Sequence, residues 1–180
     1  MEESFVQVQR SVKWLEDITT GAIGFELESR TLQGLRVIRA QRGFLRCSFT
    51  VPSDASDANG NWHVGAIATI IDNVGGAAIY STADRVKVTL DFNISYYSAA
   101  RTQEQVEIEA KVIGNKGKLT SVVVEVRKKD NGENWQVGDI ATLIDNVGGA
   151  AMYSTIDRLK VTFDFNISYY STARISILTV

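Results

Sequence analysis

The chain has 180 residues, of which 44% are apolar and 22% charged, and its formal net charge is −2. This composition is typical of a globular protein that buries one sizeable core, so we expect one domain. The slightly acidic balance and the scattered lysines and arginines argue against a nucleic-acid partner, and no run approaches the roughly 20 apolar residues that span a bilayer.

The first 61 residues predict a helix, two strands and a loop. Apolar residues recur at three- and four-residue spacings over 5–18, which indicates an amphipathic helix. Extended patterns follow over 35–40 and 43–51, and residues 53–61 have the Ser, Asp, Asn and Gly content of a loop. The single cysteine, Cys47, cannot form an intramolecular disulfide. We therefore expect a packed thiol and an intracellular location, with the cytoplasm as the first expectation and a peroxisome or another organelle left open.

The most apolar segment, 64–80, predicts a second helix that other elements must enclose. Its apolar residues recur at helical spacing with almost no charge on any side, and such a helix is stable only when it is buried. The pair Gly75 and Gly76 costs about 1 kcal/mol per glycine relative to alanine, a cost usually tolerated where a helix approaches another backbone closely.

Three alternating patterns, 86–96, 106–112 and 122–126, predict strands after this helix. The links between them are short enough for an antiparallel meander. One buried helix followed by such strands predicts an α+β domain in which the sheet curls around the helix.

Residues 62–101 return as 135–174, with about four positions in five identical. The second copy contains the sequence of the helix and of one long strand, but not the preceding strands or the two closing ones. We therefore expect the functional domain, with its N-terminal helix, in 1–134. Residues 135–180, a partial repeat of 62–101 (helix plus strand), are not expected to form an independent domain.

Asp72 is the first candidate for chemistry because it is an acid on an apolar helix. Burial raises the pKa of an unpaired carboxyl, which suits a general base or a nucleophile. The structural alternative is a buried carboxylate satisfied by backbone or by a partner chain. Thr89 and Asp91 are expected on one face of the next strand, where Thr89 can hydrogen-bond Asp72 or position a water, unless it is an ordinary β-branched strand residue.

His63, the only histidine, precedes the helix at a place where backbone N–H groups lack intrahelical acceptors. Those donors can hold an oxygen on which negative charge builds, although a lone histidine is more often a helix cap. One histidine and the absence of Cys/His spacing argue against a zinc site. Neither Gly-x-Ser-x-Gly nor a phosphate-binding glycine loop is present, which argues against a serine hydrolase and a P-loop protein. We expect no metal and no cofactor.

The run Asn-Gly-Asn-Trp-His-Val-Gly-Ala-Ile-Ala-Thr-Ile-Ile-Asp at 59–72 resembles the His-Gly-Gly…Asp signature of the acyl-CoA thioesterase 13-like (PaaI-type) hotdog thioesterases. Residues 88–96 and 114–118 resemble that family's next strand and turn, and the likeness, closest to plant members, covers about residues 10–130. The resemblance implies a single hotdog fold, a long central helix wrapped by a curved antiparallel sheet, followed here by the C-terminal half-repeat.

The same resemblance implies hydrolysis of acyl-CoA to free acid and coenzyme A at a site shared between the subunits of a homodimer or homotetramer. It assigns Asp72 to activate water or to attack directly, with Thr89 assisting. The turn formed by His63, Val64 and Gly65 of the neighbouring subunit would donate to the oxyanion.

Residues that orient the nucleophile or contact coenzyme A also follow from the resemblance. Asp57 or Asn59 corresponds to an asparagine that orients the nucleophile. The segments that contact coenzyme A are matched by Tyr96, Tyr97, Ser98, Arg101, Lys116, Gly117 and Lys118.

The sequence departs from the family pattern at two places. Val64 replaces the first glycine after the histidine, which preserves a backbone N–H provided that the turn needs no positive φ. The family continues into a final strand after residue 133; here 135–140 either replaces that strand or the sheet loses an edge.

The repeat also leaves other functions open. In the second copy Gln136 replaces His63, and Asp139 adds an acid that would repel an oxyanion, so we expect no second active site. A hotdog dehydratase is one alternative, although it would pair a histidine with the acid. A catalytically inactive hotdog protein, or an acyl-CoA-binding module, is the other, if the half-repeat blocks dimerisation or destabilises the sheet.

Overall fold

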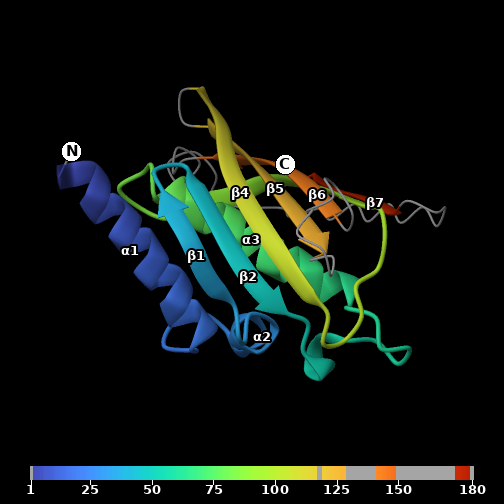
Figure 1. Cartoon of the computed structure of the whole chain (residues 1–180). Helices are drawn as coiled ribbons and strands as arrows, with labels where there is room; N and C mark the ends of the chain where they lie inside the picture. Colours follow the sequence, from blue (N-terminus) through green and yellow to red (C-terminus); the bar gives the residue numbers. More distant parts are fainter. Residues whose placement is uncertain (1, 117–118, 129–140, 149–172, 179–180) are drawn as a thin grey trace.

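A curved antiparallel sheet wraps around one helix in the computed structural model, which describes residues 2–116, 119–128, 141–148 and 173–178 (Figure 1). The predicted α+β architecture is confirmed. The helices are α1 (Glu2–Thr19), α2 (Glu26–Thr31) and α3 (Val64–Tyr80), with a short 3₁₀ helix η1 (Ser53–Ala55). The strands are β1 (Arg36–Gln41), β2 (Phe44–Thr50), β3 (Val88–Tyr96), β4 (Gln105–Lys116), β5 (Leu119–Lys128), β6 (Ala141–Gly148) and β7 (Ala173–Leu178).

The strands pair in the order β1-β2-β4-β5-β6-β3-β7, each antiparallel to its neighbours. β4 and β5 form the predicted hairpin, but the meander expected from β3 to β4 is wrong. After β3 the chain passes the start of α3, where the Trp62 N–H donates to the Ala100 carbonyl at 2.7 Å. It then enters β4 beside β2, so β3 belongs to the opposite half of the sheet.

Residues 141–148 form strand β6, although they repeat the helical sequence 68–75 with a single change, Ile70 to Leu143. The helix expected in the second copy is therefore wrong over these residues. α3 already fills the concave face that would bury a second apolar helix, whereas β5 and β3 offer unpaired edges, and such tertiary contacts override a helical pattern. β6 forms the strand beside β5 that was expected from residues 135–140. Residues 135–140 and most of the repeat lie outside the described residues. The predicted domain boundary at residue 134 stays a prediction.

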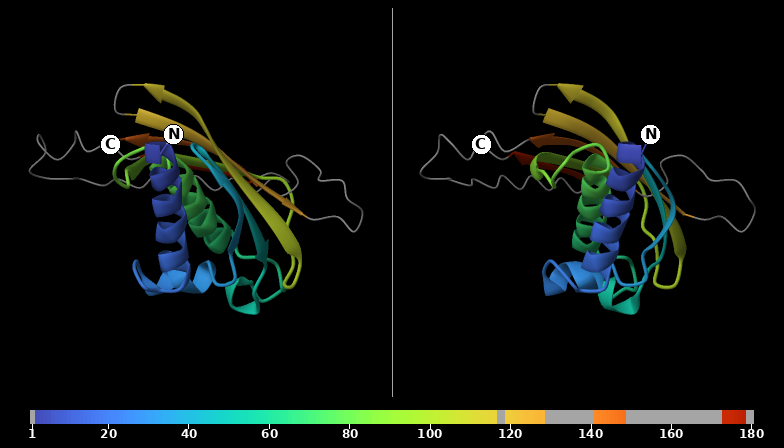
Figure 2. Two further views of the ribbon diagram at one scale, coloured as in Figure 1. Left: turned by 60° about the vertical axis from the view of Figure 1, so that its left-hand side comes forward. Right: turned by 90° about the vertical axis from the view of Figure 1, so that its left-hand side faces the viewer.

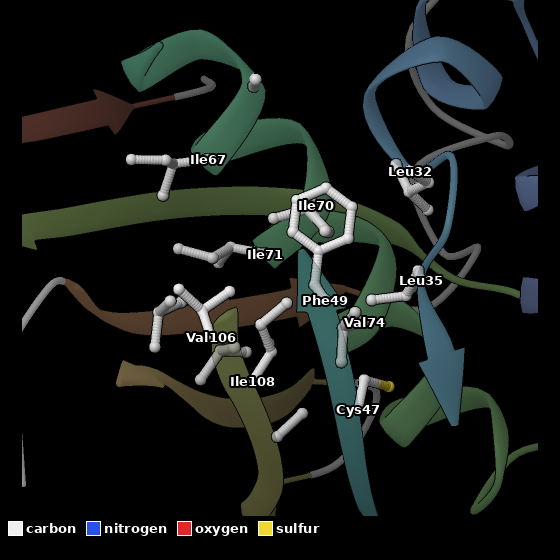
Figure 3. Close-up of a cluster of buried hydrophobic side chains, with 14 of the residues drawn as sticks. Leu32, Leu35, Cys47, Phe49, Ile67, Ile70, Ile71, Val74, Val106 and Ile108 are labelled. Atoms are coloured by element: carbon white, nitrogen blue, oxygen red, sulfur yellow. The ribbon is translucent and has the colours of Figure 1, made fainter. Parts of the chain in front are cut away.

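The core lies between α3 and the concave face of the sheet (Figure 3). Ile70, Ile71 and Val74 of α3 are fully buried and belong to one cluster with Phe49 of β2. Cys47 is also fully buried, and burial raises the pKa of its thiol to about 12. The prediction of a packed, unreactive thiol is therefore confirmed.

α1 packs against α3 as a brace on the side away from the sheet (Figure 2). The Trp14 and Tyr80 rings meet edge to face with centroids 6.0 Å apart, and the Arg10 guanidinium lies 4.7 Å from the Tyr80 centroid. The predicted N-terminal helix is thus confirmed. Within the described residues, no helix combines the length and apolar character needed to cross a membrane.

The glycine pair of α3 serves two different contacts. A Cβ on Gly75 would lie 3.1 Å from Val124 Cγ2 and 3.4 Å from Val122 Cγ1 of β5, whereas a Cβ on Gly76 would lie 3.7 Å from the Trp14 ring. Only Gly75 therefore marks the close approach that the sequence predicted, and it does so against side chains of the sheet.

We expect Gly76→Ala to raise the free energy of unfolding by about 0.5–1 kcal/mol, because alanine favours the helix and its methyl group finds ordinary contact with Trp14. Gly75→Ala serves as the matched variant and should be less stable than Gly76→Ala, since its methyl group crowds the valines of β5. Urea unfolding of both variants measures the difference; equal stability would contradict the tight contact at Gly75.

Candidate active site

Asp72 lies in the third turn of α3, partly buried between the helix and strand β3. The Thr89 hydroxyl donates to Asp72 Oδ1 at 2.9 Å, so the hydrogen bond predicted from the sequence is present. Burial raises the pKa of the Asp72 carboxyl, the Thr89 hydrogen bond opposes that rise, and the nearby Glu28 carboxylate adds to it. Among the described residues, Thr89 is thus the hydroxyl partner of a partly desolvated carboxylate, an arrangement that suits general-base chemistry.

A bulge in β3 aims Thr89 at Asp72. In the pairing with β6, Thr89 faces Val147 and Asp91 faces the adjacent Asn146, so Leu90 is the additional residue. β-bulges re-aim side chains in this way and are frequent next to active sites. The expectation that Thr89 and Asp91 share a face is wrong, because regular alternation from the buried Phe92 places Asp91 on the opposite side of the strand from the helix.

His63 is the N-cap of α3, and its Nδ1 accepts a hydrogen bond from the Gly65 N–H at 3.1 Å. Among the described residues, none accepts a hydrogen bond from the N–H of Val64 or Ala66. These two donors remain available at the positive end of the helix dipole. Val64 does not have a positive φ, so the change from glycine to valine leaves the turn unstrained.

Tyr96 fixes this turn from the end of β3. Its hydroxyl donates to the Val64 carbonyl at 3.2 Å, and burial raises the pKa of the phenol, so it stays a donor. The residue expected to touch coenzyme A therefore also positions the first peptide units of α3. The sequence offered no signal for this contact.

The carboxylate and the free donors lie far apart within one chain. Val64 and Asp72 are separated by eight residues of continuous helix, which corresponds to about 12 Å at 1.5 Å per residue. A single carbonyl group that must lie within about 3 Å of both a nucleophile and an oxyanion donor cannot bridge that distance. Within one chain, Asp72 and the N–H group of Val64 therefore cannot act on the same carbonyl group.

The loop residues Asp57 and Asn59 do not join Asp72. Asp57 Oδ1 accepts hydrogen bonds from the backbone N–H of Asn59 at 2.8 Å and of Asn61 at 2.9 Å, and the Asn61 bond is the main reason why the pKa of Asp57 is lowered. Within the chain this carboxylate closes its own loop.

The residues expected to bind coenzyme A lie at two ends of the sheet. Tyr97, Ser98 and Arg101 are exposed next to the start of β4, whereas Lys116 is exposed at its end. The twelve residues of β4 extend roughly 35 Å, too far for one phosphate group to touch both ends. Gly117 and Lys118 lie outside the described residues.

Comparisons with known proteins identify the family to which the chain is similar. A model of the thioesterase superfamily matches residues 59–134. Acyl-coenzyme A thioesterase 13 of Homo sapiens is 30% identical over 115 residues, which are 63% of this chain and 80% of that protein. Acyl-coenzyme A thioesterase 13 of Mus musculus is 27% identical over 105 residues, which are 58% of this chain and 75% of that protein.

Solved structures of thioesterases share the fold of this chain. Zebrafish thioesterase superfamily member 2 is 25% identical, covers 79% of this chain and 97% of its own, and superposes with a TM-score of 0.66. A hypothetical thioesterase of Streptococcus pneumoniae, solved with coenzyme A, shares the fold at 16% identity and a TM-score of 0.58. The match covers 64% of this chain and 88% of that one.

Because burial raises its pKa, Asp72 binds a proton more readily in the folded protein than in the unfolded chain. The free energy of unfolding therefore falls as pH rises through the pKa of the folded state. We expect Asp72→Asn to melt at a higher temperature than the wild type at pH 7, and the gain to shrink near pH 4. Thermal unfolding at both pH values tests this, with the exposed Asp84→Asn as control; a less stable Asp72→Asn at pH 7 would favour a structural carboxylate.

Proposed function

The chain belongs to the thioesterase superfamily and hydrolyses acyl-CoA thioesters to free acid and coenzyme A, and we propose that the Asp72 carboxylate drives this reaction at a site shared by two copies of the chain. The observation that carries the proposal is the partly buried carboxylate with its raised pKa and its single hydroxyl partner, Thr89. No group of His, Cys, Asp and Glu that could hold a metal is found among the described residues.

The deprotonated carboxylate can act in two ways. It can take a proton from a water molecule as that water attacks the thioester carbon, after which the C–S bond breaks and the coenzyme A thiolate leaves. It can also attack the carbon itself, which breaks the C–S bond, expels the coenzyme A thiolate and forms a mixed anhydride that water then hydrolyses. In both routes Thr89 holds the unprotonated carboxylate in place.

The oxyanion donors come from the second copy in this proposal. As the thioester carbonyl becomes tetrahedral, its oxygen gains negative charge that backbone N–H groups at a helix start can stabilise. Val64 and Ala66 offer such donors, and the helix length of about 12 Å between Val64 and Asp72 supports their action on the substrate of the neighbouring copy. The separation of Arg101 from Lys116 along β4 supports contacts of coenzyme A with two copies in the same way.

Two further expectations belong to the proposal. The groups proposed to act are a carboxylate, a hydroxyl and backbone amides, so hydrolysis is expected to need no cofactor and to survive a chelator. An intracellular location is supported by the free thiol of Cys47; imaging of the tagged full chain inside or outside the cell tests it.

Asp72→Asn should lower kcat by about 10²–10⁴-fold, the range for loss of a general base. Thr89→Val should move the acid limb of the pH–rate profile to higher pH, because the Thr89 hydrogen bond lowers the pKa of Asp72. Thr89→Ser, which keeps the hydroxyl, is the matched control and should retain the wild-type limb. Thiol release from a panel of fatty and aromatic acyl-CoAs measures these rates.

The panel also separates the alternatives. A folded full chain that binds acyl-CoA but releases no thiol would mean a binding module, and undiminished release by Asp72→Asn would assign the chemistry to another group.

Val64→Pro removes one of the two proposed oxyanion donors without removing a hydrogen bond of the fold. Val64 is the first residue of α3, a position that proline favours, and His63 before it is already extended, at φ −66° and ψ 132°. We expect circular dichroism and melting temperature like those of the wild type and a kcat lowered about 10²–10³-fold.

Mixing the two variants tests whether the site is shared. An assembly of one Asp72→Asn chain with one Val64→Pro chain contains one intact site if Asp72 and the Val64 N–H come from different copies. We expect activity to return when the two inactive proteins are unfolded and refolded together. No recovery from verified mixed assemblies would place both groups in the same copy.

A further inference from the structure

An open cavity of about 680 Å³ lies where the β1–β2 turn meets the residues that follow α3 and the second half of β4 (Figure 1). Cavities that bind small molecules commonly have volumes of about 300–1,000 Å³. Neither Asp72 nor the start of α3 lines this cavity, so it is separate from the groups proposed to carry out the hydrolysis.

The cavity carries more positive than negative charge. Arg42, Lys87 and Lys111 line it together with one carboxylate, that of Glu109. This carboxylate accepts a hydrogen bond from the Arg46 guanidinium at 2.6 Å, so its charge is already balanced. Within the described part of the chain, no acid forms an ion pair with any of the three lining cations. These cations are therefore available to an anionic ligand.

Lys87 is the cation that the fold holds in place. Its side chain is half-buried, its ammonium group donates to the Thr120 hydroxyl at 2.7 Å, and that hydroxyl donates to Asn115 Oδ1 at 2.8 Å. Two N–H donors of the ammonium group and the NH₂ group of Asn115 thus have no acceptor among the described residues. A partly buried cation without a carboxylate partner is stabilised by a bound anion.

The β1–β2 turn forms a fixed wall of the cavity. Gly43 adopts a positive φ of 74°, its N–H donates to Ser81 Oγ at 2.7 Å, and its carbonyl accepts from the Val112 N–H at 2.8 Å. A Cβ on Gly43 would lie 3.4 Å from both Thr82 Cγ2 and Val112 Cβ. Arg42, the residue before Gly43, therefore starts from an ordered backbone, and little ordering of the turn is required when a ligand binds.

We propose that Arg42, Lys87 and Lys111 bind a phosphate group in this cavity. A phosphate monoester carries a charge of about −1.5 to −2 at pH 7, which suits three cations better than the single charge of a carboxylate does. Its oxygens can accept hydrogen bonds from the ammonium and guanidinium groups and from the Asn115 amide. The three cations are not among the residues that the family resemblance assigns to coenzyme A.

The position of the cavity is compatible with two sources of this phosphate group. Lys87 lies two residues before Thr89, about 7 Å along an extended backbone, and Thr89 holds Asp72. Coenzyme A is therefore one source, and this assignment rests on the function proposed above. The other source is a free phosphorylated small molecule that binds beside the site without reacting.

Calorimetric titration of the full chain with coenzyme A, pantetheine and inorganic phosphate tests the proposal. Lys87→Met should weaken the binding of coenzyme A or of inorganic phosphate about tenfold, because it removes charge-assisted hydrogen bonds. Lys87→Arg keeps the charge and should retain most of the affinity. Lys13→Met is the matched control, since Lys13 is an exposed lysine of α1 that pairs with Asp17 at 2.9 Å, and its affinities should equal those of the wild type.

A second variant guards against an effect on folding. In Lys87→Met the Thr120 hydroxyl keeps its bond to Asn115, and the melting temperature verifies the fold. Lys111 forms no hydrogen bond or ion pair with a described residue, so Lys111→Met removes only charge. This variant should weaken binding about threefold, as expected for an exposed charge.

The three ligands separate the two sources. Weaker coenzyme A binding with unchanged binding of pantetheine, which has no phosphate group, would assign the cavity to the substrate. Weaker binding of inorganic phosphate with unchanged coenzyme A binding would assign it to a free phosphorylated molecule.

The proposal would be overturned if the wild type bound neither coenzyme A nor inorganic phosphate. Unchanged affinities for both ligands in Lys87→Met and Lys111→Met, or an equal loss in Lys13→Met, would overturn it as well. None of these ligands is a thioester, so a failure of the wild type to hydrolyse acyl-CoA would count against the proposed function alone.

Discussion

Burial of α3 is the constraint on which the rest of the structure depends. The helix carries a single charged residue, Asp72, and most of its other side chains are apolar or small, so it is stable only inside a sheet that curves around it. Gly75 lets the sheet approach, and α1 covers the side that the sheet leaves open. The same burial that stabilises the helix raises the pKa of its one carboxyl, so packing and chemistry have a common cause.

Helix α3 also separates the two groups that the proposed mechanism uses. Its start carries N–H groups that no described residue pairs with, and its middle carries the carboxylate, about 12 Å away. No side-chain movement within a rigid helix can close such a distance, and for this reason the proposed mechanism takes its donors from another copy of the chain. In this chain β7 pairs with Asp91–Tyr96 of β3 and covers the outer edge of the strand that carries Thr89.

The bounds of α3 and its N-cap could be predicted because periodicity, the loop composition before it and the position of His63 all indicated the same start. Strand order could not, since it depends on which edges meet in space. The segment 141–148 makes the point most clearly: with one conservative change it repeats a helical sequence, yet it is a strand between β5 and β3. An apolar pattern indicates which side chains can be buried, whereas the neighbouring elements determine whether the segment is buried as a helix or as a strand.

Only the part of the candidate site that a single residue indicates could be predicted from the sequence. An acid on an apolar helix indicated Asp72 without any knowledge of its neighbours, and the strand after the helix supplied Thr89 as a partner. The bulge at Leu90, the Tyr96 hydroxyl on Val64 and the approach of Glu28 all depend on contacts between distant segments.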